Sequence, residues 1–233
     1  MATNEVSTND FQVQYKLCDY NPKMVQAWQE LFKDHADRIQ IHNGHIFGKD
    51  APSADAIVSP ANSFGFMDGG IDMVYTRHFG WQMQERLQEV IRKEYNGEVL
   101  VGQAAIIETF EGGVKEGSLD WSKYNGGQPI KFLISAPTMR VPLEVADTVN
   151  AYLAFRAVIL AVKKHNAVPA NEPIRSVLCP GLGTAVGRMP PERCAFQMCR
   201  AFEVYELGMH KNVLNPTHLE YPCADHETMT QYV

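Results

Sequence analysis

The sequence has no apolar run long enough to span a bilayer, and its first residues lack the basic and apolar parts of a secretory signal peptide. It also has no excess of positive charge. Its 21 Lys and Arg residues stand against 27 Asp and Glu residues, for a net charge of −6. That balance opposes general attraction to nucleic acids or membrane surfaces. We therefore expect a cytoplasmic protein that binds neither nucleic acid nor membrane.

Cysteines are few and follow no metal-binding pattern. The chain has five, an odd number, and they are scattered along the sequence. Cys194 and Cys199 are five residues apart, which is not the C-x-x-C spacing of zinc or redox motifs. No His, Asp and Glu residues have the spacing of a metal-ligand motif either. We expect reduced thiols, no metal site and no cofactor.

The composition is that of a globular protein, with 45% hydrophobic and 21% charged residues, and 233 residues suit one large domain. Short apolar runs that favour strands alternate with stretches at helical spacing. This alternation predicts an α/β domain with a mixed, largely parallel sheet. The predicted strands lie at 11–18, 39–41, 55–59, 104–107, 131–136 and 174–179, and the predicted helices begin at Asn21-Pro22 and span 71–95 with a break near Gly80, 145–165 and 194–207. Residues 111–129 are rich in Gly and polar residues, which predicts a surface excursion.

One stretch, DAIVSPANSFGFMDGGID at 55–72, joins a buried strand to a glycine loop and a helix start. Pro60 ends the strand because proline cannot donate a hydrogen bond to a sheet. Glycine lets the backbone approach a ligand closely, and a helix N-terminus attracts anions through its free amides and its dipole. The stretch therefore predicts a phosphate site, with Asn62 and Asp72 flanking it.

A second glycine loop, PGLGTAVG at 180–187, also follows a predicted strand and precedes a helix. It is not a Walker loop, because Arg188-Met189 follows Gly187 in place of Lys-Ser/Thr. It is not a Rossmann fingerprint either, because no ribose-binding acid follows at the expected distance. In an α/β sheet, ligands bind outside the carboxyl ends of the strands, so the two loops together are suited to grip a diphosphate.

Together, these two stretches resemble the macro-domain family. VSPANSFGFMDGGID is similar to the family's strand ending in Ala-Asn, followed by glycines and Val/Ile-Asp, and PGLGTAVGRMPPERCA is similar to its second loop and proline-started helix. The resemblance covers about residues 38–207 and implies a three-layer α-β-α fold. We expect one macro-like domain over 1–233, with a strand–helix extension at 1–37 and a C-terminal tail at 208–233.

The resemblance also implies a ligand and roles for particular residues. Macro domains bind ADP-ribose, and many hydrolyse its derivatives. The implied catalytic residues are Asn62, which contacts the distal ribose, and Asp72, which orients or activates water at the anomeric carbon. His45 stands where the family has an aspartate that reads the adenine amino group. The other implied ligand-binding residues are Ile46, Ala61, Gly69, Gly70, Ile71, Gly181, Gly183, Thr184, Ala185, Val186 and Gly187.

The function implied by the resemblance is hydrolysis at the distal ribose of ADP-ribosylated side chains or of O-acetyl-ADP-ribose. The implied partner is ADP-ribose or an ADP-ribosylated protein. Three alternatives stay open: phosphatase action on ADP-ribose 1″-phosphate, a non-catalytic reader of ADP-ribose, and binding of another nucleotide. Local roles also stay open, since Asp72 suits a helix N-terminus and Asn62 suits an Asx turn.

Overall fold

A six-stranded sheet forms the centre of the protein in the computed structural model, which describes residues 12–112 and 119–233. The strands are β1 (Gln14–Asp19), β2 (Ile39–Asn43), β3 (Ala56–Ser59), β4 (Ala105–Glu108), β5 (Phe132–Ser135) and β6 (Ser176–Cys179). Their order is β2-β1-β6-β3-β5-β4. All neighbouring pairs are parallel except β4–β5. This confirms the predicted mixed, largely parallel sheet.

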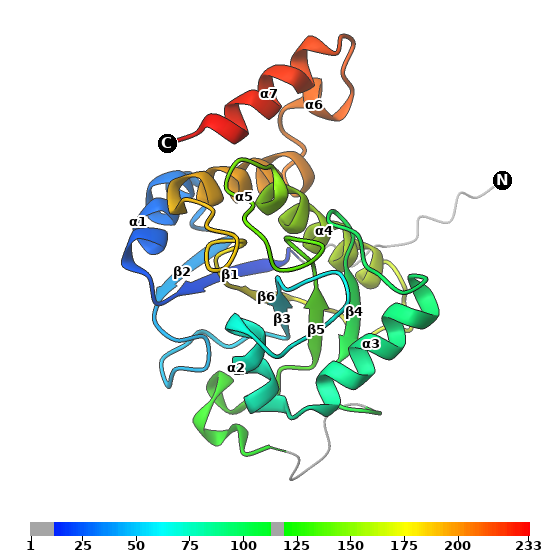
Figure 1. Cartoon of the computed structure of the whole chain (residues 1–233). Helices are drawn as coiled ribbons and strands as arrows, with labels where there is room; N and C mark the ends of the chain where they lie inside the picture. Colours follow the sequence, from blue (N-terminus) through cyan, green and yellow to red (C-terminus); the bar gives the residue numbers. More distant parts are fainter. Residues whose placement is uncertain (1–11, 113–118) are drawn as a thin grey trace, which may run out of the picture.

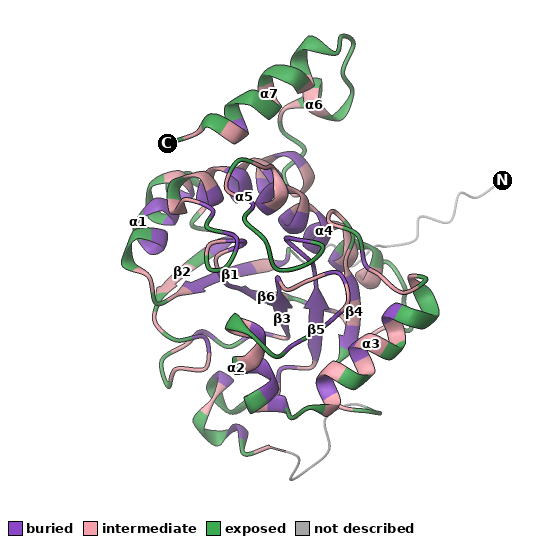
Figure 2. Ribbon diagram, in the orientation of Figure 1, coloured by how far each residue is buried: buried purple, intermediate pink, exposed green. Residues whose placement is uncertain are grey.

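Helices cover both faces of this sheet (Figure 1). The α-helices before the C-terminal pair are α1 (Pro22–Leu31), α2 (Gly70–Phe79), α3 (Gln82–Glu94), α4 (Asn150–Asn166) and α5 (Pro191–Tyr205). One core cluster joins α1, α4 and α5 to one sheet face, and a second joins α2 and α3 to the other. Figure 2 shows the buried strands between these layers. The three-layer α-β-α fold is therefore confirmed.

Strand β1 belongs to the interior of the sheet. The sequence predicts that residues 1–37 are an extension outside the core. In the structure, Tyr15 pairs with Ile39 of β2 on one side and with Val177 of β6 on the other. Leu17 of the same strand is fully buried. An inner strand with neighbours on both sides is part of the core, so a core boundary at residue 38 is wrong.

Local sequence signals account for the helix starts and stops. Pro22 begins α1, and the Asn21 side chain caps it by accepting a hydrogen bond from the Lys23 amide at 3.1 Å. Gly80, at φ 85°, ends α2 and separates it from α3, as predicted. Among the described residues, no helix has the length and apolar character needed to cross a membrane.

The predicted surface excursion at 111–129 is partly packed into the protein. Residues 113–118 lie outside the described residues. After them, Trp121 is buried, and the Asn125 side chain exchanges two hydrogen bonds with the Ala54 backbone, at 2.7 and 3.0 Å. Asn125 thereby satisfies backbone groups of the segment before β3, which a solvent-exposed loop would not do.

The predicted tail at 208–233 folds into α6 (Lys211–Leu214) and α7 (Glu220–Gln231). In Figure 1, α7 lies outside α5. Met229 of α7 is buried and its carbonyl accepts a hydrogen bond from Gln197 at 3.1 Å, while Asp225 of α7 pairs with Arg200 of α5 at 3.1 Å. Figure 2 shows the rest of α7 as mostly exposed.

Candidate functional site

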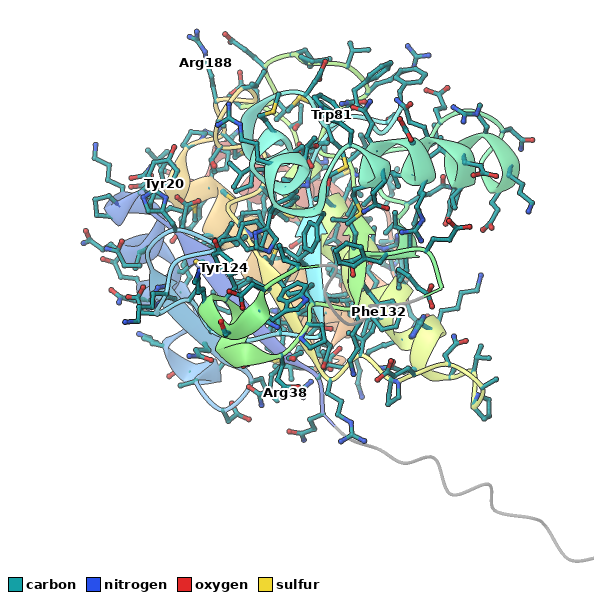
Figure 3. The ribbon with its side chains drawn as sticks, turned by 90° about the horizontal axis from the view of Figure 1, so that it is seen from below. Tyr20, Arg38, Trp81, Tyr124, Phe132 and Arg188 are labelled. Carbon is teal, nitrogen blue, oxygen red and sulfur yellow. The ribbon has the colours of Figure 1, made fainter. Side chains whose placement is uncertain are left out.

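A cavity of about 540 Å³ lies at the carboxyl ends of β1, β3 and β6. Small-molecule sites in proteins have volumes of roughly 300–1,000 Å³. Both glycine loops contribute to its wall, together with the segment after β1. Figure 3 shows Tyr20 and Arg188 toward one end of the sheet, and Arg38, which precedes β2, toward the opposite end. The cavity therefore lies at the position where ligands bind in proteins with open parallel sheets.

The structure brings most of the predicted site residues to this cavity. Asn62 and Asp72 both line it. So do Ala61, Gly69, Gly70, Ile71, Gly181, Gly183, Thr184, Ala185, Val186 and Gly187. Their chemical roles remain predictions.

His45 and Ile46 do not line the cavity. Ile46 is buried, and the His45 ring stacks on the ring of Tyr20 with centroids 5.6 Å apart. Tyr20 lines the cavity and is 69% exposed. The strand order gives the reason: β1 lies between β2 and β6, so the end of β1 is next to the second glycine loop, and the end of β2 is one strand further out. Tyr20 is absent from the predicted site residues because strand order is not visible in a sequence.

The first glycine loop leaves amide donors free at the cavity. Gly69 is the N-cap of α2 and Gly70, at φ 55°, is its first residue. The first amides of a helix have no intrahelical acceptor, so those of Gly70 and Ile71 are available to a ligand. Gly69 and Gly70 are exposed and have open space where a Cβ would stand. The positive end of the helix dipole faces the same space.

The second glycine loop supplies another set of amide donors. It is closed by hydrogen bonds from the Met189 amide to the Gly183 carbonyl at 2.9 Å and from the Val145 amide to the Gly187 carbonyl at 2.7 Å. Within the part of the chain that the structure describes, the amides of residues 184–187 have no hydrogen-bond acceptor. Ala185 and Val186 are exposed at the cavity wall. Such a loop satisfies its amides by binding an anion or water.

Asp72 is a buried carboxyl at the cavity wall, in the first turn of α2. It is 4% exposed, and the Ser59 hydroxyl at the end of β3 donates a hydrogen bond to its Oδ1 atom. Burial raises the pKa of Asp72 to about 7, although the Ser59 hydrogen bond opposes the rise. A pKa near neutrality suits a group that must accept a proton in catalysis. The sequence did not identify Ser59 as part of the site.

Asn62 lines the cavity, but its side chain also closes its own turn. Its Nδ2 atom donates to the Phe66 carbonyl at 2.8 Å, and its Oδ1 atom accepts from the Phe64 and Phe66 amides at 3.1 and 3.3 Å. The Asx-turn role considered for Asn62 is therefore present in the structure. One amide hydrogen remains for a ligand.

The cavity is acidic. Asp19, Asp68 and Asp72 line it, and no Lys or Arg of the described residues does. Asp19 is fixed in place, because its carboxylate accepts hydrogen bonds from the Asn21 amide at 2.8 Å and the Gly181 amide at 3.2 Å. An anionic ligand must therefore be held by backbone amides and helix dipole, which carry no full charge.

Within the described part of the chain, one group has metal-ligand geometry. Atoms of His35, Cys199 and Glu203 lie within 4.8 Å of one another, away from the cavity lining. Burial raises the pKa of the Cys199 thiol to about 12, and a metal needs the thiolate. The Arg200 guanidinium lies 3.7 Å from the Glu203 carboxylate and competes with a cation there. We assign this group to packing of the 3-10 turn after α1 (Lys33–His35) against α5.

The fold and cavity define an α/β domain in which two glycine loops line one cavity at the carboxyl ends of parallel strands. The sequence model of the macro-like domain family matches residues 3–228, so this chain belongs to that family. The resemblance seen in the two loops is thereby confirmed.

The proteins similar to this chain include two relatives and two solved structures. An uncharacterized protein of Aquifex aeolicus is 30% identical over 168 residues, 72% of this chain and 82% of its own length. An uncharacterized protein of Sulfolobus acidocaldarius is 27% identical over 161 residues, which are 69% of this chain and 74% of that protein. The DarG macrodomains of Mycobacterium tuberculosis and Thermus aquaticus align with TM-scores of 0.50, at 21% and 16% identity. They cover 69% and 70% of this chain, and 87% and 89% of their own. These two structures support the fold alone.

Proposed function

We propose that this protein binds ADP-ribose and hydrolyses ADP-ribose derivatives at the distal ribose. The observation that carries the proposal is a buried carboxyl, Asp72, with a pKa near 7, in the same cavity as two sets of free backbone amides. The amides suit a diphosphate, and the carboxyl suits proton transfer beside it. Membership of the macro-like domain family makes ADP-ribose the expected diphosphate.

The base of the ligand would lie at Tyr20. An exposed aromatic ring at the cavity wall offers a stacking surface for a nucleobase. The adjacent Asp19 carboxylate accepts two backbone hydrogen bonds and keeps lone pairs for an amino group. Tyr20 and Asp19 would thus replace the acid expected at position 45.

The chemical step would use water as the nucleophile. Ionised Asp72 takes a proton from a water molecule, whose oxygen forms a bond to the anomeric carbon of the distal ribose. The bond from that carbon to the acceptor oxygen breaks, and its electron pair leaves with the acceptor. A carboxylate is a stable leaving group that needs no general acid, so esters of acidic side chains at the anomeric carbon are the favoured substrates. With O-acetyl-ADP-ribose the same water would add to the acetyl carbonyl carbon, and the bond from that carbon to the ribose oxygen would break, with the ribose oxygen taking the proton from Asp72. The free hydrogen on the Asn62 amide would hold a ribose hydroxyl.

Two experiments test the proposal. Calorimetric titration with ADP-ribose, ADP and AMP is expected to show tightest binding for ADP-ribose, because the distal ribose adds contacts. Incubation with a protein ADP-ribosylated on acidic residues is expected to release ADP-ribose. Binding without release would favour a reader. With ADP-ribose 1″-phosphate in ¹⁸O-labelled water, release of inorganic phosphate that carries the label would favour the phosphatase, which attacks phosphorus, whereas unlabelled phosphate would show attack at the anomeric carbon.

Replacing Tyr20 tests the base end of the cavity. Tyr20→Ala is expected to weaken ADP-ribose binding about 5- to 100-fold, the scale of one lost aromatic–base stack. In turnover, KM rises while kcat stays close to that of the parent, because Tyr20 is not at the reacting atoms. Tyr20→Phe keeps the ring and serves as the control. If His45→Ala weakens binding as much as Tyr20→Ala does, the base lies at His45.

Replacing Ser59 tests the environment of Asp72. The Ser59 hydroxyl stabilises the ionised carboxylate, so Ser59→Ala is expected to raise the pKa of Asp72 further. The pH at which turnover reaches half its maximum should then rise by about one to two, since a hydrogen bond to a charged group contributes roughly 1.5–3 kcal/mol. Ser63→Ala is the matched control, because Ser63 is also buried in this segment and, among the described residues, its hydroxyl has no hydrogen-bond partner. An unchanged pH profile in Ser59→Ala would exclude Asp72 as the titrating group.

A further inference from the structure

A second hollow of about 200 Å³ adjoins the cavity and has no role in the proposed function. It is lined by Phe64, Phe66, Gln88, Ile91, Arg92 and Gly97. Phe66 lines both the cavity and this hollow. We call the second space the Phe66 hollow. Because the two spaces share the Phe66 side chain as a wall, a ligand that fills the cavity can extend past it.

The Phe66 hollow adjoins the end of the cavity where the reaction would occur. Asn62, assigned to the distal ribose, binds both the amide and the carbonyl of Phe66 through its side chain. These bonds fix the Phe66 backbone, while the side chain is 51% exposed. The group attached to the distal ribose would therefore leave the cavity next to this ring.

The charge of the hollow is opposite to that of the cavity. Arg92, in the last turn of α3, is exposed and has no hydrogen-bond or ion-pair partner among the described residues. The nearby Arg140 is neutralised, because it pairs with Glu98 at 2.8 Å while its guanidinium lies over the Phe64 ring. Arg92 is thus the unpaired cation of a small space walled by two aromatic rings.

We propose that the Phe66 hollow is an acceptor subsite that takes an acidic side chain neighbouring the ADP-ribosylated residue of a protein. This deepens the proposed function and rests on it. The apolar walls accept the aliphatic part of the chain, and Arg92 pairs with its carboxylate. A space of about 200 Å³ with one unpaired cation suits a single side chain. Nucleic acid, with a charge at every phosphate, calls for several cations.

The test compares two peptides, each ADP-ribosylated on one glutamate, with either aspartate or alanine beside it. Binding is measured by calorimetry on protein carrying Asp72→Asn, so that turnover does not consume the ligand. We expect the aspartate peptide to bind about two- to fivefold more tightly, the range of an exposed ion pair. Adding Arg92→Ala should remove this preference. Adding Lys93→Ala, the matched loss of one exposed charge in the same helical turn, should preserve it.

Other outcomes separate failure of the hollow from failure of the proposed function. Equal affinity for the two peptides, or equal effects of Arg92→Ala and Lys93→Ala, overturns the acceptor subsite while ADP-ribose binding stands. Tighter binding of an ADP-ribosylated oligonucleotide than of either peptide overturns the choice of a protein acceptor. If free ADP-ribose does not bind, the proposed function and the subsite are both overturned. Arg92→Glu adds a positive readout, because it should reverse the preference toward a peptide with lysine beside the modified glutamate.

Discussion

Asp72→Asn is expected to lower the release of ADP-ribose at least about 100-fold, the usual scale for loss of an acid–base group. Binding of ADP-ribose should stay within about threefold of the parent protein, because an asparagine has the same shape and the phosphates are assigned to backbone amides. Single-turnover release and calorimetric titration measure the two quantities. A variant that retains release would remove Asp72 from the chemistry, and one that loses binding would make it a ligand-holding residue.

The same substitution, which lowers turnover, is expected to raise the stability of the protein above neutral pH. A buried carboxyl whose folded pKa is about 7, against an ordinary value near 4, binds its proton more tightly in the folded state. Its contribution to stability is therefore full below about pH 4 and is lost as the pH rises through 7. Asp72→Asn cannot ionise, so at pH 8 it should be more stable than the parent by about 1–4 kcal/mol. Melting temperatures at pH 5 and pH 8 should show a larger difference at pH 8.

A stability gain combined with a loss of turnover is the signature of a functional site. A carboxyl held in a buried position at a cost in stability is retained for what it does. If Asp72 served only as an acid at a helix N-terminus, its removal would lower stability at pH 8, because an ionised acid there interacts favourably with the dipole. The sign of the stability change thus distinguishes a carboxyl held at a cost in stability from a stabilising helix-terminal acid, and the turnover measurement tests the catalytic role.

The sequence identified the glycine loops because their signals are local. A strand, a proline stop, glycines and a helix start are all contained in residues 55–72, and the same order recurs at 174–191. Parallel strands bring such loops to one edge of the sheet, so their shared cavity followed from the fold class. Asp72 was identified by its place in this pattern.

Long-range contacts were not predictable in the same way. Tyr20 reaches the cavity because β1 lies beside β6, which follows it by more than 150 residues. The Ser59 contact with Asp72 depends on how α2 turns back over the end of β3. The pairing of Asn125 with Ala54 spans 71 residues. Each of these depends on strand order or on the path of a loop, neither of which has a periodic signal in the sequence.

Gly187→Ala is expected to weaken ADP-ribose binding at least about tenfold and to destabilise the protein by about 1–3 kcal/mol. A Cβ at this position would lie 2.5 Å from the Gly183 carbonyl oxygen and 2.6 Å from Cγ2 of Val145. The Gly183 carbonyl cannot yield freely, because it accepts the Met189 hydrogen bond that closes the loop. The loop must therefore open, which displaces the amides of residues 184–187 from a common anion. Hydrogen bonds to charged groups contribute roughly 1.5–3 kcal/mol each, so displacing one or two accounts for the expected loss.

Gly69→Ala, in the first glycine loop, is the matched control for Gly187→Ala in the second. Gly69 also lines the cavity, but its φ of −146° suits any residue and no atom lies within 4 Å of an added Cβ. We expect Gly69→Ala to melt within a few degrees of the parent. If Gly187→Ala loses much more stability than Gly69→Ala does, the loss reflects packing at the second loop. Melting curves and ADP-ribose titrations of both variants give the comparison. If Gly187→Ala is destabilised as expected but binds ADP-ribose as tightly as the parent, the amides of residues 184–187 do not hold the phosphates.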